Sequence, residues 1–83
     1  MTIKLTLYTK NKCGLCEEAK EEIEFLRKEF NFLLEEIDIY SDDALLEEYQ
    51  LKIPVLQVNG KEVAFGRIHK NDILNAINRI SNY

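Results

Sequence analysis

"LTLYTKNKCGLCEEAKEEIEFL" occupies residues 5–26 and decides the fold of this 83-residue chain. It opens on alternating apolar and polar residues, which indicate a β-strand that we expect to span residues 2–9. A polar loop follows. From Cys16 onward, apolar residues recur every three or four positions, which predicts a helix over about residues 13–30. The two cysteines of the chain, Cys13 and Cys16, therefore stand where a loop meets the start of a helix.

Working outward, the rest of the chain continues the alternation of strands and helices. The patterns predict strands over residues 32–39, 54–58 and 61–65, and helices over about 42–50 and 70–81. Ser41 is the expected N-cap of the short helix. Asn59-Gly60 is a strong hairpin signal between the last two strands, which we expect to be antiparallel. The first two strands are joined through a helix, so they should be parallel.

The bulk composition fits one small globular domain spanning residues 1–83. The hydrophobic fraction is 46%, which suffices for a single core. No apolar run is long enough for a membrane span, and the N-terminus lacks the features of a signal peptide. We therefore expect a cytoplasmic protein. Because thiols are mostly reduced there, a close cysteine pair is more typical of catalysis or metal binding than of a structural disulfide.

The charges are unevenly distributed along the chain. The net charge is −4, yet the segment from Glu17 to Glu48 holds thirteen acids and three bases. The flanking segments hold two acids and eight bases, and could form a positive surface if the fold brings them together. The alternative is two solvated acidic helices with no functional meaning. The overall acidity and the absence of a nucleic-acid motif argue against a nucleic-acid partner.

The cysteine pair is expected to be asymmetric. Cys13 should lie near the helix N-cap, where unpaired backbone N–H groups, the helix dipole, Lys10 and Lys12 favour a thiolate. Cys16 lies one turn further and belongs to the apolar stripe. Residues three apart on a helix are close enough for a disulfide. Cys13 could therefore attack a substrate disulfide and Cys16 could resolve the mixed disulfide.

Other roles for the pair are open at this point. A structural zinc site needs four ligands, and the chain offers Cys13, Cys16 and His69 besides carboxylates. A metal ion or iron–sulfur centre shared between two chains is another alternative. The cysteines could also be inert core residues, although Cys13 precedes the helix in a basic, polar loop. The redox pair is the interpretation that the residues favour.

The stretch at residues 5–26, the order of elements and "IPVLQVNGKEV" at residues 53–63 together resemble a glutaredoxin-like protein of the thioredoxin superfamily. The resemblance covers nearly the whole chain. It implies an α/β, thioredoxin-like (glutaredoxin-type) β-α-β-α-β-β-α fold with a four-stranded mixed sheet and three helices. It also implies that Cys13 and Cys16 are the nucleophilic and resolving cysteines. Pro54 matches the family's cis-proline opposite them.

The resemblance further implies substrate-binding residues. Ile53, before the proline, matches the residue whose backbone pairs with an extended substrate. Lys10 matches a lysine near the glutathione carboxylate. Asn71 and Asp72 stand for the last two positions of the family's glutathione motif before the final helix.

The sequence departs from typical glutaredoxins at two places. Gly14-Leu15 stands between the cysteines where Pro-Tyr is typical, which affects the reduction potential. Ile68-His69 replaces a Gly-Gly pair that lets the backbone approach glutathione. In this fold the loops that carry most flanking bases should meet at the active site. A basic rim around Cys13 is therefore expected from Lys10, Lys12, Lys52, Arg67, His69 and Lys70.

Together these features predict a small thiol–disulfide oxidoreductase that uses Cys13 and Cys16 and binds no cofactor. Glutathione is a candidate co-substrate. The expected partners are a disulfide-containing protein or a glutathione mixed disulfide, and a glutathione or thioredoxin-type reductase. The alternatives are an iron–sulfur or metal carrier and a non-catalytic interaction module on the same scaffold.

Overall fold

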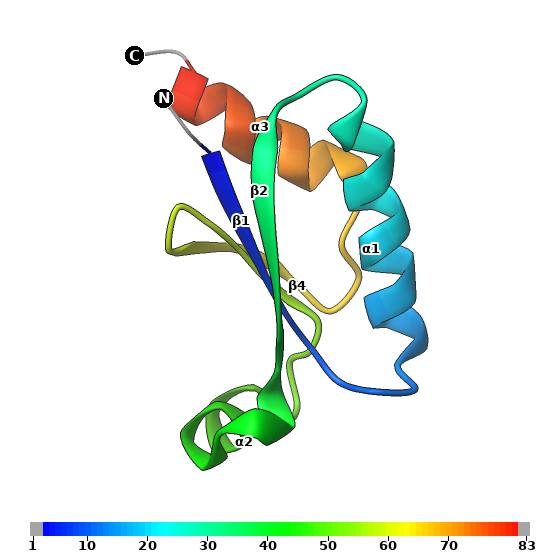
Figure 1. Ribbon diagram of the computed structural model, residues 1–83, viewed down its shortest axis with the longest axis vertical. Helices are drawn as coiled ribbons and strands as arrows, with labels where there is room; N and C mark the ends of the chain where they lie inside the picture. The colour runs from blue at the N-terminus through cyan, green and yellow to red at the C-terminus, as the bar shows by residue number, and fades with distance from the viewer. Residues whose placement is uncertain (1–2, 82–83) are drawn as a thin grey trace.

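The elements follow one another in the expected order (Figure 1). The structure is a computed structural model that describes residues 3–81. Its strands are β1 (Ile3–Thr9), β2 (Phe32–Asp38), β3 (Val55–Val58) and β4 (Lys61–Phe65). Its helices are α1 (Gly14–Arg27), the short 3-10 helix η1 (Ile39–Ser41), α2 (Asp43–Tyr49) and α3 (Lys70–Ser81).

The four strands form one mixed sheet in the order β2-β1-β3-β4. β1 and β2 are parallel and β3 and β4 are antiparallel, as the sequence predicts, and β3 is also antiparallel to β1. β1 is central, and the other elements are arranged around it. Because β3 runs against β1, the start of β3 lies at the same end of the sheet as the end of β1, where Tyr8 pairs with Val55.

The main core lies between one face of the sheet and the two longer helices. Leu5 and Leu7 of β1 are fully buried there, because strand residues two apart point to the same face. They pack with α1, β3 and α3 side chains, among which Ile23 and Ile77 are also fully buried. Tyr8 points to the other face. It joins a smaller cluster around Ile39, Tyr49 and Val55, which α2 covers.

The Asn59-Gly60 turn is the expected hairpin turn. Both residues have positive φ, 51° and 85°, as a type I′ turn requires. The turn is also tied to β1, because Asn59 donates its N–H to the carbonyl of Lys4 at 2.8 Å. The Lys4 N–H in turn donates to Oδ1 of Asn59 at 2.8 Å. These bonds fix the tip of the hairpin against the start of the central strand.

Two predicted helix boundaries are wrong. The first helix ends at Arg27 rather than near Phe30, and the N–H groups of both Glu29 and Phe30 donate to the carbonyl of Leu26. The N-cap of α2 is Asp42 rather than Ser41.

The shift of the N-cap has a local cause. Oδ1 of Asp42 accepts the N–H of Ala44 at 2.8 Å, which is the usual capping contact. Ser41 instead ends η1, and its hydroxyl donates to the carbonyl of Asp38 at 2.6 Å. The sequence pattern did not reveal η1, because a single 3-10 turn has no periodicity of its own.

In residues 3–81, no helix combines the length and the apolar character needed to cross a membrane.

Candidate active site

The cysteine pair lies at the N-terminus of α1 and is joined as a disulfide. Cys13 is the N-cap, with the extended backbone angles φ −117° and ψ 109° that this position takes. Cys16 is in the first turn. The two Cα atoms are 5.2 Å apart, within the range of natural disulfides. The predicted position and proximity of the pair are confirmed.

The two sulfur atoms differ in their surroundings, as predicted. Cys16 is 1% exposed and lies on the buried face of α1 with Ala19 and Ile23. Cys13 is half-buried, and its Sγ accepts the backbone N–H of Cys16 at 3.2 Å. Cys13 is therefore the more accessible residue of the pair.

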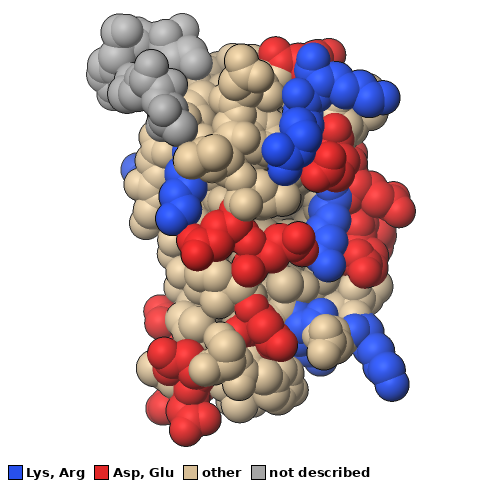
Figure 2. Space-filling view, in the orientation of Figure 1, with Lys and Arg blue, Asp and Glu red and all other residues tan. Residues whose placement is uncertain are grey.

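The loop before Cys13 carries exposed positive charge. Lys10 and Lys12 are both exposed, and basic side chains project at the lower right of Figure 2, where Figure 1 draws this loop. Lys12 has a φ of 55°, in the left-handed region that residues other than glycine seldom adopt. Gly14, directly after Cys13, has open space where a side chain would begin, with no atom within 4 Å. The glutathione role of Lys10 stays a prediction.

Pro54 lies at the same end of the sheet as this loop. The Ile53–Pro54 peptide bond is cis, which confirms the expectation from the resemblance. Pro54 itself is fully buried. The N–H of Gly66, just after β4, donates to the carbonyl of Pro54 at 2.8 Å and to that of Lys52 at 3.2 Å. These bonds tie the proline loop to the end of the neighbouring strand.

One of the two backbone polar groups of Ile53 is already hydrogen-bonded within the protein. Its N–H donates to the carbonyl of Tyr49 at 3.1 Å, and that oxygen also accepts the N–H of Lys52 at 2.8 Å. In the described part of the chain, no donor is paired with the carbonyl of Ile53. An extended substrate could pair with this carbonyl at once, but pairing with the N–H would require the Tyr49 bond to open. Substrate pairing at Ile53 stays a prediction.

Asn71 and Asp72 lie at the start of α3, beside the C-terminal half of α1 rather than beside Cys13. The position of this helix start follows from Lys70, the first residue of α3, whose Nζ lies 4.6 Å from the centre of the Phe25 ring of α1. Phe25 comes twelve residues after Cys13, which is about 18 Å along a helix axis. Asn71 is exposed. The structure does not bring these two residues to the sulfur atoms, and their substrate-binding role stays a prediction without support from this placement.

Asp72 has a structural role that the sequence analysis missed. Its Oδ2 accepts the backbone N–H of His69 at 3.1 Å, while its own N–H donates to the carbonyl of His69 at 2.9 Å. A carboxylate that reaches back three residues in this way caps the helix. The sequence signal for this cap is the spacing of three residues between His69, which precedes α3, and the acidic Asp72.

Replacing Asp72 with alanine is expected to lower the free energy of unfolding by about 1 kcal/mol, because one N–H at the start of α3 loses its acceptor. Asn71→Ala is the matched control. Its side chain is exposed and makes no hydrogen bond within residues 3–81, so a change below about 0.5 kcal/mol is expected. Urea unfolding of both variants measures the difference. Equal stability of the two variants would contradict the capping role.

The expected basic rim is smaller than predicted. Lys52 pairs with Glu62 at 3.0 Å and lies over the ring of Phe65, so its charge is largely offset. The prediction is wrong for Lys70, which packs on Phe25. His69 is exposed and precedes α3. Of the six residues, Lys10 and Lys12 are those that the loop itself places next to Cys13.

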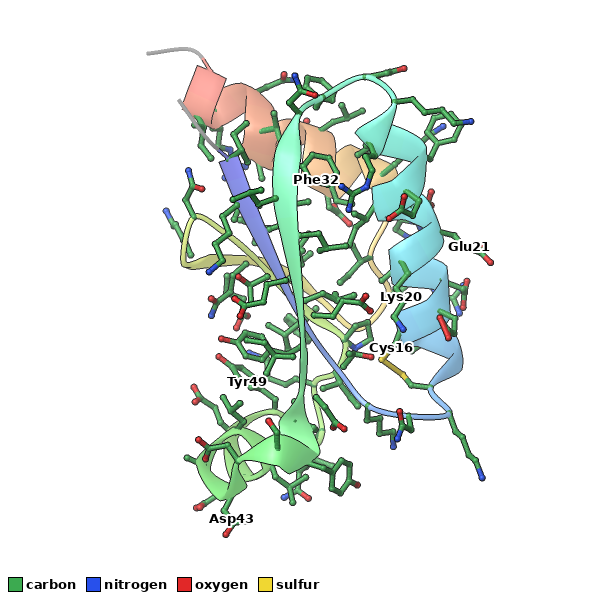
Figure 3. The ribbon with its side chains drawn as sticks, viewed as in Figure 1. Cys16, Lys20, Glu21, Phe32, Asp43 and Tyr49 are labelled. Carbon is green, nitrogen blue, oxygen red and sulfur yellow. A yellow bond between two sulfur atoms is a disulfide. The ribbon has the colours of Figure 1, made fainter. Side chains whose placement is uncertain are left out.

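Lys20 is a residue near the site that the sequence analysis did not single out. It lies one turn after Cys16 on the side of α1 that faces the sheet, whereas Glu21 points away (Figure 3). Its Nζ lies 3.1 Å from Glu36 of β2 and 3.5 Å from Glu17. The hydrogen bond to Glu36 raises the pKa of Lys20, so the group stays protonated at neutral pH. The sequence could have indicated this position, because Lys20 is four residues after Cys16 and residues four apart lie on the same face of a helix.

Tyr49 packs in the smaller core cluster next to the proline loop. Its ring stacks on that of Tyr8 with centroids 4.7 Å apart, and Ile53 packs against the same cluster. Burial raises the pKa of Tyr49, so its hydroxyl is neutral well above neutral pH. Tyr8 thus packs in the smaller core cluster, while Tyr40 is exposed.

The sequence matches the model of a known protein family along most of the chain. The Glutaredoxin-like domain (DUF836) matches residues 4–78, which include both cysteines and Pro54.

Solved structures agree with this match. Protein Ne2328 from Nitrosomonas europaea is 30% identical, with a TM-score of 0.78 over 93% of this chain and 92% of that one. Protein XcR50 from X. campestris is 28% identical, with a TM-score of 0.75 over 90% and 96%. A mutant thioredoxin from Halobacterium salinarum has a TM-score of 0.69 over 93% of this chain and 73% of its own. At 21% identity, that likeness shows the thioredoxin-like fold. The chain belongs to the glutaredoxin-like (DUF836) domain family.

Proposed function

We propose that the protein is a thiol–disulfide oxidoreductase in which Cys13 is the nucleophile and Cys16 the resolving thiol. The observation that carries the proposal is the asymmetric pair at the start of α1. Cys13 is half-exposed at the N-cap, and Cys16 is 1% exposed behind it. A pair with equal exposure would give no reason to assign the two steps to different residues.

The reaction runs in two exchanges that begin with the reduced protein. The Cys13 thiolate attacks one sulfur of a substrate disulfide, a new S–S bond forms, and the other substrate sulfur leaves as a thiolate that takes up a proton. Cys16 then loses its proton and attacks Sγ of Cys13. The second substrate thiol departs, and the Cys13–Cys16 disulfide forms. The substrate gains two electrons and two protons, and the protein loses them.

Local groups support the role of Cys13. The N–H of Cys16 donates to its sulfur at 3.2 Å, and Lys10 and Lys12 in the preceding loop add positive charge. Donors and cations of this kind favour the thiolate over the thiol. Within residues 3–81, the unpaired carbonyl of Ile53 offers one hydrogen-bond acceptor to an extended substrate at the same end of the sheet.

The reductant that resets the disulfide is either two molecules of glutathione or a thioredoxin-type reductase. A steady-state assay with a small mixed disulfide tests both, with glutathione plus its reductase in one arm and thioredoxin reductase in the other. We expect turnover in at least one arm, which would also identify the reductant. Absence of turnover in both arms would contradict the proposal.

A metal or cluster carrier is the second interpretation, and the same preparations test it. In residues 3–81, no three His, Cys, Asp or Glu side chains are grouped to hold a metal ion, so such a centre would have to be shared between chains. Iron bound to protein purified without oxygen, together with no turnover, would support the carrier over the oxidoreductase.

A further inference from the structure

A surface cavity lies between the β3–β4 hairpin and the C-terminal half of α3. We call it the hairpin crevice. Its volume is about 420 Å³, within the range of small-molecule sites. Its lining residues are Val58, Asn59, Lys61, Glu62, Val63, Ala76, Arg79 and Ile80.

The hairpin crevice lies far from the disulfide. Asn59 is bonded to Lys4 at the start of β1, whereas Cys13 follows the end of β1. A seven-residue strand spans about 20 Å, so the two places are at opposite ends of the sheet. A molecule in the crevice would not touch the sulfur atoms.

The floor of the crevice is apolar and its walls are fixed. Val58 and Ala76 are 3% and 6% exposed and belong to the main core, and Val63 and Ile80 pack against that core. The turn at Asn59 is bonded to β1 through both its backbone and its side chain. The crevice is therefore formed before any ligand arrives, which lowers the cost of binding.

Basic side chains line the crevice on both its hairpin side and its α3 side. Lys61 comes from β4 and Arg79 from α3, and both are exposed. In the described part of the chain, neither takes part in an ion pair. Glu62 also lines the crevice, but its carboxylate pairs with Lys52 at 3.0 Å. The crevice is thus a positive, partly apolar hollow on a protein of net charge −4.

We propose that the hairpin crevice binds a small amphipathic anion, a carboxylate joined to an apolar chain or ring. The carboxylate would lie between Lys61 and Arg79, since a guanidinium and an ammonium group both pair with carboxylates. The apolar part would cover Val63 and Ile80, which are partly exposed, next to the buried Val58 and Ala76. This site is independent of the thiol chemistry, so a Cys13→Ser protein is expected to bind the anion as well as the natural protein does.

The test is a titration of the oxidised protein with octanoate, followed by backbone amide shifts in NMR spectra. Saturable shifts are expected at residues 58–63 and 76–80, with residues 10–16 unchanged. Octanol lacks the charge and inorganic phosphate lacks the apolar part, so each should bind at least about tenfold more weakly.

Charge-neutralising variants give the matched comparison. The double variant Lys61→Gln, Arg79→Gln should weaken octanoate binding by about tenfold or more, while Lys12→Gln, an exposed base at the other end of the sheet, should leave it unchanged. The proposal would be overturned by non-saturable shifts, by shifts centred on residues 10–16, by equal binding of octanol or phosphate, or by full binding in the double variant.

Discussion

Replacing Cys13 with serine is expected to abolish disulfide reduction, with a loss of turnover on the order of a thousandfold or more. A hydroxyl at the N-cap is not ionised at neutral pH and cannot form the mixed disulfide. Serine is a good N-cap, so α1 should keep its start and the variant should stay folded. The steady-state assay with the small mixed disulfide measures the loss, and thermal unfolding checks the fold.

Cys16→Ser is the matched variant, because it removes a thiol of the same pair and leaves the nucleophile in place. It should still form a mixed disulfide but fail to resolve it by its own second thiol. Only a route that uses one protein thiol and external glutathione would then be left. Full turnover in Cys13→Ser, or equal behaviour of the two variants, would contradict the division of roles between the cysteines.

Leu7→Ala is expected to lower the free energy of unfolding by about 2–5 kcal/mol. Leu7 lies on β1 and is 0% exposed. Its side chain is on the face of the sheet that α1 and α3 cover, and it packs in the main core with side chains of both helices. Truncation loses buried apolar surface and leaves a cavity that this rigid strand cannot close. Small domains have a total stability of about 5–15 kcal/mol, so this one change should remove a large share of it.

Leu51→Ala is the control, since the same side chain is removed from a residue that is 95% exposed. A change below about 0.5 kcal/mol is expected there. Urea unfolding curves of both variants give the comparison. Similar losses in the two variants would mean that burial on β1 does not provide the stability assigned to it.

Local sequence signals predicted the order of elements and the asymmetry of the cysteine pair. The apolar stripe that starts at Cys16 belongs to one helix, and the position of Cys13 before that stripe makes it the N-cap. The Asn59-Gly60 hairpin is equally local, since both residues take the positive φ of the turn. The cis bond at Pro54 was different, because the resemblance to a family, and not the local sequence, led to that prediction.

Features that depend on long side chains and on packing between distant elements could not be predicted. Lys70 was expected at the active site, but its flexible side chain reaches Phe25 of α1 instead. Lys52, in the loop before β3, pairs with Glu62 of β4. The N–H of Ile53 is used by Tyr49 because α2 ends beside the proline loop. The partners of Lys70 and Lys52 are not fixed by spacing along the chain, whereas the Tyr49–Ile53 bond joins residues only four apart.

The most direct measurement is the mass of the covalent adduct that the reduced Cys16→Ser protein forms with glutathione disulfide, followed by peptide mapping. The account predicts one glutathione per chain, attached to Cys13, and much slower adduct formation in Cys13→Ser, where only the buried Cys16 is left. An adduct that forms as quickly on Cys16 as on Cys13 would contradict the assignment of Cys13 as the nucleophile.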